Sequence, residues 1–584
     1  MDLFDILNLI GGLCLFLFGM NVMGDALERR AGGSLKKILA RLTKNKVTGF
    51  LTGLAVTAVI QSSSATTVMV VGFVNSGIMT LRQSIGVIMG ANIGTTITAW
   101  ILSLGGISSD NLFMQLLKPT SFTPVLALIG TALLMFGKTS KKKDTGTILL
   151  GFATLMFGMD TMSGAVSGLA DVPAFQNMFL MFKNPILGVL AGAILTAVIQ
   201  SSSASVGILQ ALSSTGQVSY GATVPIIMGQ NIGTCITAIL SSFGTNKNAK
   251  RAAIVHLSFN VIGTVIWLTV FSIIFAVFKP ILFDIAASYV GIAVAHSAFN
   301  IACTAILLPM SSLLEKLAIR LVPDTNKTEV VSELDERLLA TPPVALERCN
   351  TLVCEMAELS VNAVKNGIDM LNTYDSSIAE EIRKSEEKAD HYEDILGTYL
   401  VKLSSYQISD SDSATVSKLL KVIGDFERIS DHSIALLESS EEILAKSIEF
   451  NEGEKKDIKI LTDAVCEIAE LTLNAFLNND IASAKRVEPL DEVIADLKEQ
   501  MRTRQILRLQ KGESSIEEGF VWSDIITNMK RTADHCSNIA ACVINATENN
   551  MDLHRSLEDY RTNDPEFHEM RKDYMKKFHF EAIL

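Results

Sequence analysis

The chain of 584 residues is 48% hydrophobic, with a mean hydropathy of +0.34 and a formal net charge of −12 at pH 7. This mean hydropathy is high for a soluble protein and low for a chain that lies in the membrane throughout. Residues 1–316 hold 19 Lys and Arg against 10 Asp and Glu, whereas residues 317–584 carry a net charge of −21. We therefore expect an apolar membrane domain followed by an acidic soluble domain, whose charge argues against nucleic-acid binding.

The membrane domain contains an internal duplication. The sequence TAVIQSSSA occurs at residues 57–65 and again at 196–204, an offset of 139 residues. Two further blocks keep this offset: GLCLFLFGMNVM (12–23) with GFATLMFGMDTM (151–162), and IMGANIGTTITA (88–99) with IMGQNIGTCITA (227–238). No gap is needed between the blocks, so residues 12–105 and 151–244 form two related units.

The positive charges of the two units predict opposite orientations in the membrane. Residues 28–46 of the first unit hold seven Lys and Arg, whereas the equivalent residues 167–185 hold only Lys183. The loop after the second unit, TNKNAKR (245–251), is in turn the more basic of the two following loops. Because positive loops stay in the cytoplasm, the units form an inverted repeat, which is a transporter architecture. Two last spans, near 252–278 and 287–309, then place the acidic domain in the cytoplasm.

The QSSS sequences interrupt apolar segments at 48–80 and 187–218. Unpaired backbone at membrane depth is tolerated only when it is buried in protein or lines a cavity, so we expect each QSSS to form the break of a re-entrant helical hairpin. Hydroxyl and amide donors with helix N-termini suit an oxyanion such as phosphate, and hard oxygen ligands suit sodium. The hairpin regions contain almost no charge, and Arg82 is the nearest cation to the first motif. An anion bound without a fixed arginine needs co-bound cations to offset its charge, which favours sodium coupling. For the QSSS sequences, the alternative explanation is that small residues allow helices to pack closely. For NIGT, the alternative explanation is a glycine-containing helix start capped by Asn or Thr.

The paired QSSS motifs, each followed by NIGT, closely resemble the sodium-dependent phosphate cotransporter family, in its type II group and bacterial relatives, over about residues 1–315. The resemblance implies two inverted repeats whose hairpins jointly bind phosphate and sodium. At Thr66 and Thr67 the second copy departs from the first, with Ser205 and Val206 in their place. The residues carried over by position are Gln61, Ser62, Ser63, Ser64, Thr66, Asn92, Thr95, Gln200, Ser201, Ser202, Ser203, Asn231 and Thr234.

The sequence of the acidic domain predicts long amphipathic helices over residues 345–560, because apolar residues recur at helical spacing and Gly and Pro are few. A second internal repeat, DFERISDH (425–432) against NMKRTADH (528–535), predicts two related three-helix units in a bundle. The fold class is therefore all-α. We place the transport domain at 1–315, a linker at 316–344, the bundle at 345–560 and a C-terminal tail at 561–584.

These helices resemble the PhoU domain, a regulator associated with phosphate transport. The resemblance implies that carboxylates four residues apart bind a divalent or transition metal ion, and here the matching residues are Glu386, Asp390, Glu427 and Asp431. In the second unit Lys530 occupies the place of Glu427. The alternative explanation is a solvated acidic helix face, because carboxylate pairs are common on exposed helices.

The leading hypothesis is a sodium-coupled inorganic phosphate symporter of the cell membrane, with a cytoplasmic regulatory domain and a cytoplasmic partner for it. The alternatives are a membrane-anchored phosphate sensor and an exporter of phosphate or a related oxyanion. The sequence has no Walker A motif, nucleophile elbow or credible catalytic triad, so we expect neither an enzyme nor a nucleotide-driven pump.

Overall fold

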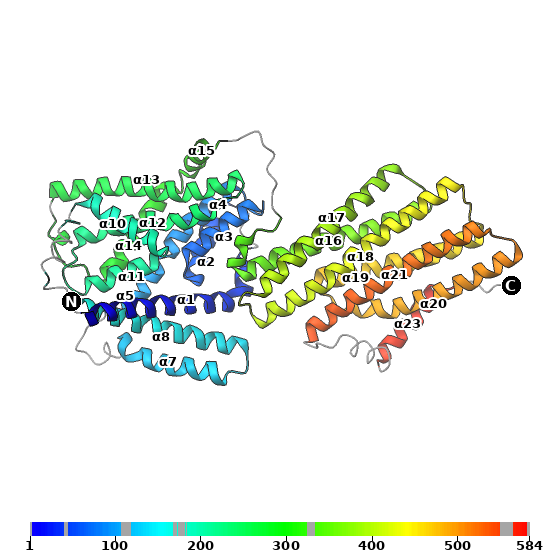
Figure 1. Ribbon diagram of the computed structural model, residues 1–584, viewed down its shortest axis with the longest axis horizontal. Helices are drawn as coiled ribbons and strands as arrows, with labels where there is room; N and C mark the ends of the chain where they lie inside the picture. The colour runs from blue at the N-terminus through cyan, green and yellow to red at the C-terminus, as the bar shows by residue number, and fades with distance from the viewer. Residues whose placement is uncertain are drawn as a thin grey trace. The chain divides into compact units, whose positions relative to one another are not determined.

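The computed structural model describes residues 3–39, 45–106, 118–167, 172, 181–182, 184–278, 280–323, 333–548 and 564–580. All regular elements in these ranges are helices, which confirms the all-α fold class, and one isolated bridge joins Ser219 to Ala286. The chain divides into two compact units, Met1–Ala345 and Leu346–Leu584 (Figure 1). Each unit is described by itself below.

The first unit is a multi-pass membrane domain. Six of the described helices are long and apolar enough to cross a membrane, and four shorter apolar helices accompany them. Its elements are α1 (Leu3–Leu39), α2 (Lys46–Ile60), α3 (Ser63–Asn75), α4 (Leu81–Gly94), α5 (Thr96–Ser103), η1 (Leu104–Gly106), α7 (Pro119–Phe136), α8 (Ser140–Ser167), α10 (Pro185–Ile199), α11 (Ser202–Ser213), α12 (Tyr220–Ser241), α13 (Lys247–Phe278), η3 (Ile281–Phe283), α14 (Tyr289–Leu307), α15 (Ser311–Leu321) and η4 (Glu336–Ala340).

The duplication is visible in the helix boundaries. The starts and ends of α2 reappear 139 residues later in α10, α3 and α11 begin at the same relative residue, and α4 with α5 corresponds to α12. The break after each first hairpin helix therefore falls at the same glutamine of TAVIQSSSA in both copies.

The equivalent helices α1 and α8 pack against each other in opposite directions (Figure 1). Gly12 faces Gly158, while Gly19 faces Gly151, so the earlier glycine of one helix meets the later glycine of the other. A Cβ atom added at Gly19 would lie 2.4 Å from the backbone nitrogen of Leu155. This reciprocal contact places a pseudo-twofold axis between the repeats and confirms that they are inverted.

Glycines also allow α2 to pack parallel to α4, and α10 to pack parallel to α12, with their backbones in contact. A Cβ atom at Gly53 of α2 would lie 2.0 Å from the carbonyl oxygen of Val87 in α4. A Cβ atom at Gly192 of α10 would lie 2.1 Å from the carbonyl oxygen of Ile226 in α12. Since both flanking helices point the same way, α3 and α11 run back between them, and each unit contains a re-entrant hairpin.

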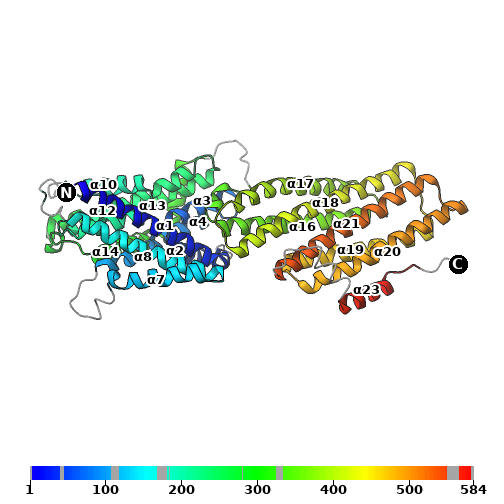
Figure 2. The ribbon, with the colours of Figure 1, turned by 60° about the horizontal axis from the view of Figure 1, so that its bottom comes forward.

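The second unit consists of α16 (Pro342–Met370), α17 (Ser376–Ser404), α18 (Asp410–Lys446), α19 (Glu452–Asn478), α20 (Ile481–Lys511), α21 (Ile516–Glu548) and α23 (Pro565–Lys577) (Figure 2). The first six form two three-helix units. Their repeat motifs meet reciprocally, because His432 Nδ1 lies 3.1 Å from Asn528 Oδ1 and His535 Nδ1 lies 2.8 Å from Asp425 Oδ1. The tail helix α23 is held on α20 by ion pairs of Arg571.

Substituting Gly53 by Ala tests the hairpin packing. The added methyl group has no room beside the Val87 carbonyl, so we expect the full chain in detergent to lose about 1–3 kcal/mol of stability and to melt at a lower temperature. Gly11→Ala is the matched control, because no described atom lies within 4 Å of its added Cβ. That control should be neutral or stabilise by about 0.5–1 kcal/mol. Equal melting temperatures for the two variants would contradict the close packing.

Candidate functional site

Each QSSS motif begins with a glutamine in the left-handed backbone region. Gln61 has φ 60° and Gln200 has φ 59°, and these residues end α2 and α10. An L-residue other than Gly adopts this conformation at a cost of about 1–2 kcal/mol, so the surrounding contacts must maintain it. Thr98 Oγ1 donates a hydrogen bond of 2.9 Å to Gln61 Oε1, and Gln61 Nε2 donates one of 2.5 Å to the carbonyl of Ala58. The first glutamine side chain is thus part of the hairpin's internal structure.

The first serine of each motif caps the returning helix. The side chain of Ser62 accepts a hydrogen bond of 3.2 Å from the backbone nitrogen of Ala65, and Ser201 accepts one of 3.2 Å from Ala204. Such a cap stabilises a helix by about 1 kcal/mol. The remaining serines differ, because the hydroxyls of Ser63, Ser202 and Ser203 make no hydrogen bond within the described part of the chain, although these residues are only 5–6% exposed.

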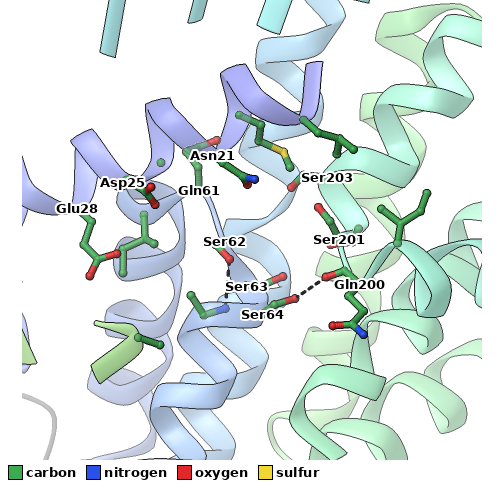
Figure 3. A pocket seen from close by; sticks show the side chains of 18 residues that line it. Asn21, Asp25, Glu28, Gln61, Ser62, Ser63, Ser64, Gln200, Ser201 and Ser203 are labelled. Carbon is green, nitrogen blue, oxygen red and sulfur yellow. Dashed lines mark hydrogen bonds between the residues drawn. The ribbon is translucent and has the colours of Figure 1, made fainter. Parts of the chain in front are cut away.

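The two hairpin tips meet at one cavity of about 410 Å³ (Figure 3). Ser64 Oγ of the first tip lies 3.4 Å from the backbone oxygen of Gln200 in the second. The volume lies within the usual range of small-molecule sites. Among the residues lining it are all eight of the predicted motif residues: Gln61, Ser62, Ser63, Ser64, Gln200, Ser201, Ser202 and Ser203.

Two helix N-termini open onto this cavity. Helices α3 and α11 begin at Ser63 and Ser202, directly after the capping serines. A helix N-terminus carries about half of a positive elementary charge and unpaired backbone N–H groups, so it favours an anion. The arrangement therefore combines two positive dipole ends with three hydroxyls that lack partners among the described residues, which is the donor set of an oxyanion site.

Thr66, also predicted as a site residue, lies inside the first hairpin and not among the residues that line the cavity. Its Oγ1 is 3.0 Å from Thr57 Oγ1 and donates a hydrogen bond of 3.0 Å to the carbonyl of Ser62. This contact joins the two arms of the hairpin close to its tip. Its counterpart Ser205 is equally buried.

The NIGT residues of the prediction also lie away from the lining of the cavity. Thr95, Asn231 and Thr234 each donate a hydrogen bond of 2.9–3.0 Å to the backbone carbonyl four residues earlier. Asn92 Oδ1 lies 3.4 Å from His256 Nε2 of α13, and both residues are buried. The structure thus places these four side chains in helix packing, and their role in binding stays a prediction.

From the sequence, Asp25 is a candidate with an interfacial role, because it lies near the basic end of its span, and the contribution of α1 to the cavity is missed. Asn21, Asp25 and Glu28 line it from the helix that passes the two hairpin tips (Figure 3). The signal was present in the sequence, because residues at positions i, i+4 and i+7 share one face of a helix. Three polar residues on one face of an otherwise apolar span mark a side that does not face lipid.

In the second unit, the four predicted metal ligands lie on the adjacent helices α17 and α18. Burial, then the charges of Asp431 and Asp390, raise the pKa of Glu386. Burial, then the charge of Asp431, raise the pKa of Glu427 to about 7. Arg428 lies 3.4 Å from both Glu427 and Asp431. Within the described ranges, however, no three His, Cys, Asp or Glu side chains take up a metal-binding arrangement.

The second three-helix unit replaces one carboxylate by a lysine. Lys530 Nζ lies 2.8 Å from Asp491 Oδ1 and also pairs with Asp534, which is the repeat counterpart of Asp431. Burial raises the pKa of Asp491 to about 6 in spite of the ammonium group. An internal cation therefore occupies the space between these carboxylates, and a metal ion has no comparable place there.

Comparison with family models assigns the two compact units of the chain to two different families. The Na⁺/Pi-cotransporter family model matches residues 15–164 and 165–302, once for each half of the membrane unit. The membrane unit belongs to the Na⁺/Pi-cotransporter family. The PhoU domain model matches residues 353–439 and 458–543 of the second unit, again twice. Both resemblances drawn from the sequence motifs are confirmed, and the family is one of transporters.

The relatives of this chain match it over different lengths. A Salmonella typhimurium protein described as "Putative inorganic phosphate export protein YjbB" is 22% identical over 545 residues, covering 92% of this chain and 97% of that protein. The human "Sodium-dependent phosphate transport protein 2B" is 36% identical over 133 residues, covering 21% of this chain and 19% of that one. The PhoU structure from Pseudomonas aeruginosa is similar with 19% identity and a TM-score of 0.34, covering 35% of this chain and 98% of its own.

Glu427→Gln tests the strained carboxylate cluster of the PhoU unit. In the folded protein the pKa of Glu427 is raised from 4.5 to about 7, so its neutral form favours folding below pH 4.5 and this stability is lost as the pH rises through 7. Glutamine keeps the neutral form at every pH. We expect thermal unfolding of the variant in detergent to occur above that of wild type at about pH 8, with the difference vanishing at about pH 4.

The control for this comparison is Glu381→Gln, which removes an exposed carboxylate of α17. It should leave the pH dependence of the melting temperature as in wild type. A melting temperature of Glu427→Gln that is lower than wild type at the higher pH would contradict the raised pKa.

Proposed function

We propose that the protein is a secondary active transporter that moves inorganic phosphate together with sodium through the cavity between the two QSSS hairpin tips. One observation carries the proposal: the largely buried residues Ser63, Ser202 and Ser203 line the cavity beside two helix N-termini, and their hydroxyls have no hydrogen-bond partner in the described chain. Phosphate accepts several hydrogen bonds and carries negative charge, so it matches this donor set. Membership of the Na⁺/Pi-cotransporter family supports the choice of substrate.

The charge of the cavity supports sodium coupling. The described residues that line it include no Lys, Arg or His. Two helix N-termini offset about one elementary charge in total, which is less than the charge of a phosphate dianion beside the acidic residues of α1. A co-bound sodium ion, held by hard oxygen ligands, would supply the missing positive charge.

The inverted repeat supports an alternating-access cycle. Re-entrant hairpins enter from opposite sides and meet at a common site, as in other transporters built from inverted repeats. In such a cycle one half moves against the other around the fixed site. Helices α1 and α8 contact each other directly through Gly12, Gly19, Gly151 and Gly158, so their crossing is a natural place for this motion.

The charged ends of the helices support a cytoplasmic PhoU unit. Arg29 at the end of α1 pairs with Asp144 at the start of α8, at 3.2 Å. Lys46 Nζ at the start of α2 lies 2.7 Å from Ser311 Oγ of α15. Arg251 at the start of α13 donates a hydrogen bond of 2.9 Å to the carbonyl of Val322. These positive helix ends gather on the side where the chain leaves the membrane unit, and the positive-inside rule assigns that side to the cytoplasm.

Regulation by the PhoU unit is supported by the segment that joins it to the membrane unit. We call residues 333–341 the strap. Asp335 is buried and its carboxylate accepts a hydrogen bond of 2.6 Å from Asn75 Nδ2 at the end of α3. Asn75 Oδ1 in turn accepts one of 2.8 Å from the backbone nitrogen of Asn246. The strap therefore fastens the end of the first hairpin to the loop between α12 and α13.

The strap also reaches the cavity. Leu338 is fully buried against α3, where a Cβ atom added to Gly72 would lie 3.0 Å from its Cδ2. Arg337 Nη2 donates a hydrogen bond of 2.8 Å to the carbonyl of Phe243. Ala340, at the end of η4, is one of the residues that line the cavity. A displacement of the strap would therefore act on the hairpin and on the proposed substrate site.

Export is the second candidate function, and the full-length relatives favour it. The Salmonella protein carries an export description and matches 92% of this chain, PhoU unit included. The same cavity serves either direction, because a secondary transporter follows the combined gradients of its ligands. A membrane-anchored phosphate sensor differs from both, since it binds phosphate and moves none.

Removing two cavity hydroxyls tests the transport site. We expect Ser63→Ala with Ser202→Ala to lower sodium-gradient-driven uptake of radiolabelled phosphate into proteoliposomes by about tenfold or more, the loss that follows when hydrogen bonds to a charged ligand are removed. Thr161→Ala in α8, a hydroxyl outside the cavity lining, is the control. Phosphate flux in wild type that does not respond to either sodium gradient would overturn sodium coupling, and phosphate binding without flux would support the sensor.

Asp335→Ala tests the strap. The substitution removes the acceptor of the Asn75 amide, so the strap binds the hairpin less tightly and we expect phosphate flux in proteoliposomes to rise by about fivefold, a typical size for coupling between sites. Glu336→Ala changes the exposed neighbouring residue and should leave the flux unchanged. Identical flux in Asp335→Ala and wild type would show that the strap does not limit transport.

A further inference from the structure

The wall of the cavity formed by α1 carries two carboxylates. Asp25 and Glu28 lie one helical turn apart and both line the space in front of the hairpin tips (Figure 3). Glu28 Oε1 is buried and has no hydrogen-bond partner among the described residues. The neighbouring guanidinium of Arg29 is engaged with Asp144 of α8. Arg29 is shared with Asp144, so it offsets only part of the negative charge of Asp25 and Glu28 at the proposed anion site.

These carboxylates are not part of the shared repeat. Their counterparts in α8, 139 residues later, are Gly164 and Ser167. The serine tips are common to both halves, whereas the acidic wall belongs to the first half alone. A group that served only to build the inverted scaffold would be expected in both halves, so the acidic wall has a function that the serine tips do not share.

The balance of charges in the cavity indicates a function for the acidic wall. Phosphate and the two carboxylates repel one another, and a medium of low dielectric constant strengthens this repulsion. The two helix N-termini together supply about one positive elementary charge, which leaves the occupied cavity strongly negative. A cation placed between the α1 wall and the serine tips removes the imbalance, because carboxylate oxygens are hard ligands that suit a sodium ion, and either carboxylate also accepts a proton.

We propose that Asp25 and Glu28 form the binding site of the coupling cation, and that the cation bound there allows phosphate to occupy the serine tips. This inference rests on the proposed transport function and assigns one of its ligands to a particular wall of the cavity. In the absence of the cation the two carboxylates repel phosphate. In its presence they hold a positive charge next to the anion, so the two ligands bind cooperatively.

The experiment measures equilibrium binding of radiolabelled phosphate to the purified full-length protein in detergent, with and without sodium, for wild type and for Asp25→Asn with Glu28→Gln. The double variant removes both negative charges and keeps the side-chain size. We expect its affinity for phosphate in the absence of sodium to exceed that of wild type by about tenfold, and the stimulation by sodium to disappear. A parallel series at lower pH without sodium distinguishes a proton from a sodium ion as the cation.

Asp160→Asn is the matched control, because Asp160 is the acidic residue of α8 that aligns with Asn21 and it does not line the cavity. It should retain the wild-type response to sodium. The single variants Asp25→Asn and Glu28→Gln cover the case in which the double variant is unstable, and each should weaken the sodium response.

The proposal is overturned if the double variant, or both single variants, keep the sodium-free affinity and the sodium response of wild type. It is also overturned if wild-type binding of phosphate responds neither to sodium nor to pH. Failure of the transport function gives a different result: the sodium response of phosphate binding is lost in the double variant while wild type shows no flux in proteoliposomes.

Discussion

The membrane unit depends on one constraint, which is that broken helices at membrane depth must find partners for their backbone groups. At the two hairpin tips the capping serines Ser62 and Ser201 satisfy part of this demand, and the left-handed glutamines turn the chain back within two residues. The starts of α3 and α11 lie at a protein-lined cavity, where a ligand can bind the N–H groups of a helix N-terminus. The proposed binding site is therefore the place where the two hairpins break.

The duplication divides the molecule into shared and individual features. Glycines at equivalent positions, such as Gly53 and Gly192, bring the helices of both halves to backbone contact, so the scaffold is nearly symmetrical. The lining of the cavity is not, because Asp25 and Glu28 occur in one half only. A nearly symmetrical scaffold with an asymmetrical lining gives the cavity two chemically different walls, which suits the proposed transport of an anion together with a cation.

The sequence was sufficient to predict the inverted repeats, the hairpin breaks and the eight residues of the QSSS tips, because identity at a constant offset and a polar break in an apolar span are local signals. The separate roles of Ser62 and Ser63 were not predictable, since they depend on where the helix starts. The place of Asp25 and Glu28 at the cavity was missed because their shared helix face is visible in the sequence, whereas the contact of that face with the hairpins is not. The strap was read as part of a linker at 316–344, since its polar composition gave no sign that Asp335 and Leu338 are buried.

The strap has a mechanical consequence. Helix η4 ends at Ala340 and α16 begins at Pro342, with only the buried Thr341 between them. A flexible spacer of several residues would let the following helix rotate without moving η4. A single residue allows little independent rotation of the two helices. Ala340, which lines the cavity, is thus separated from the first turn of α16 by a single buried residue and not by a flexible spacer.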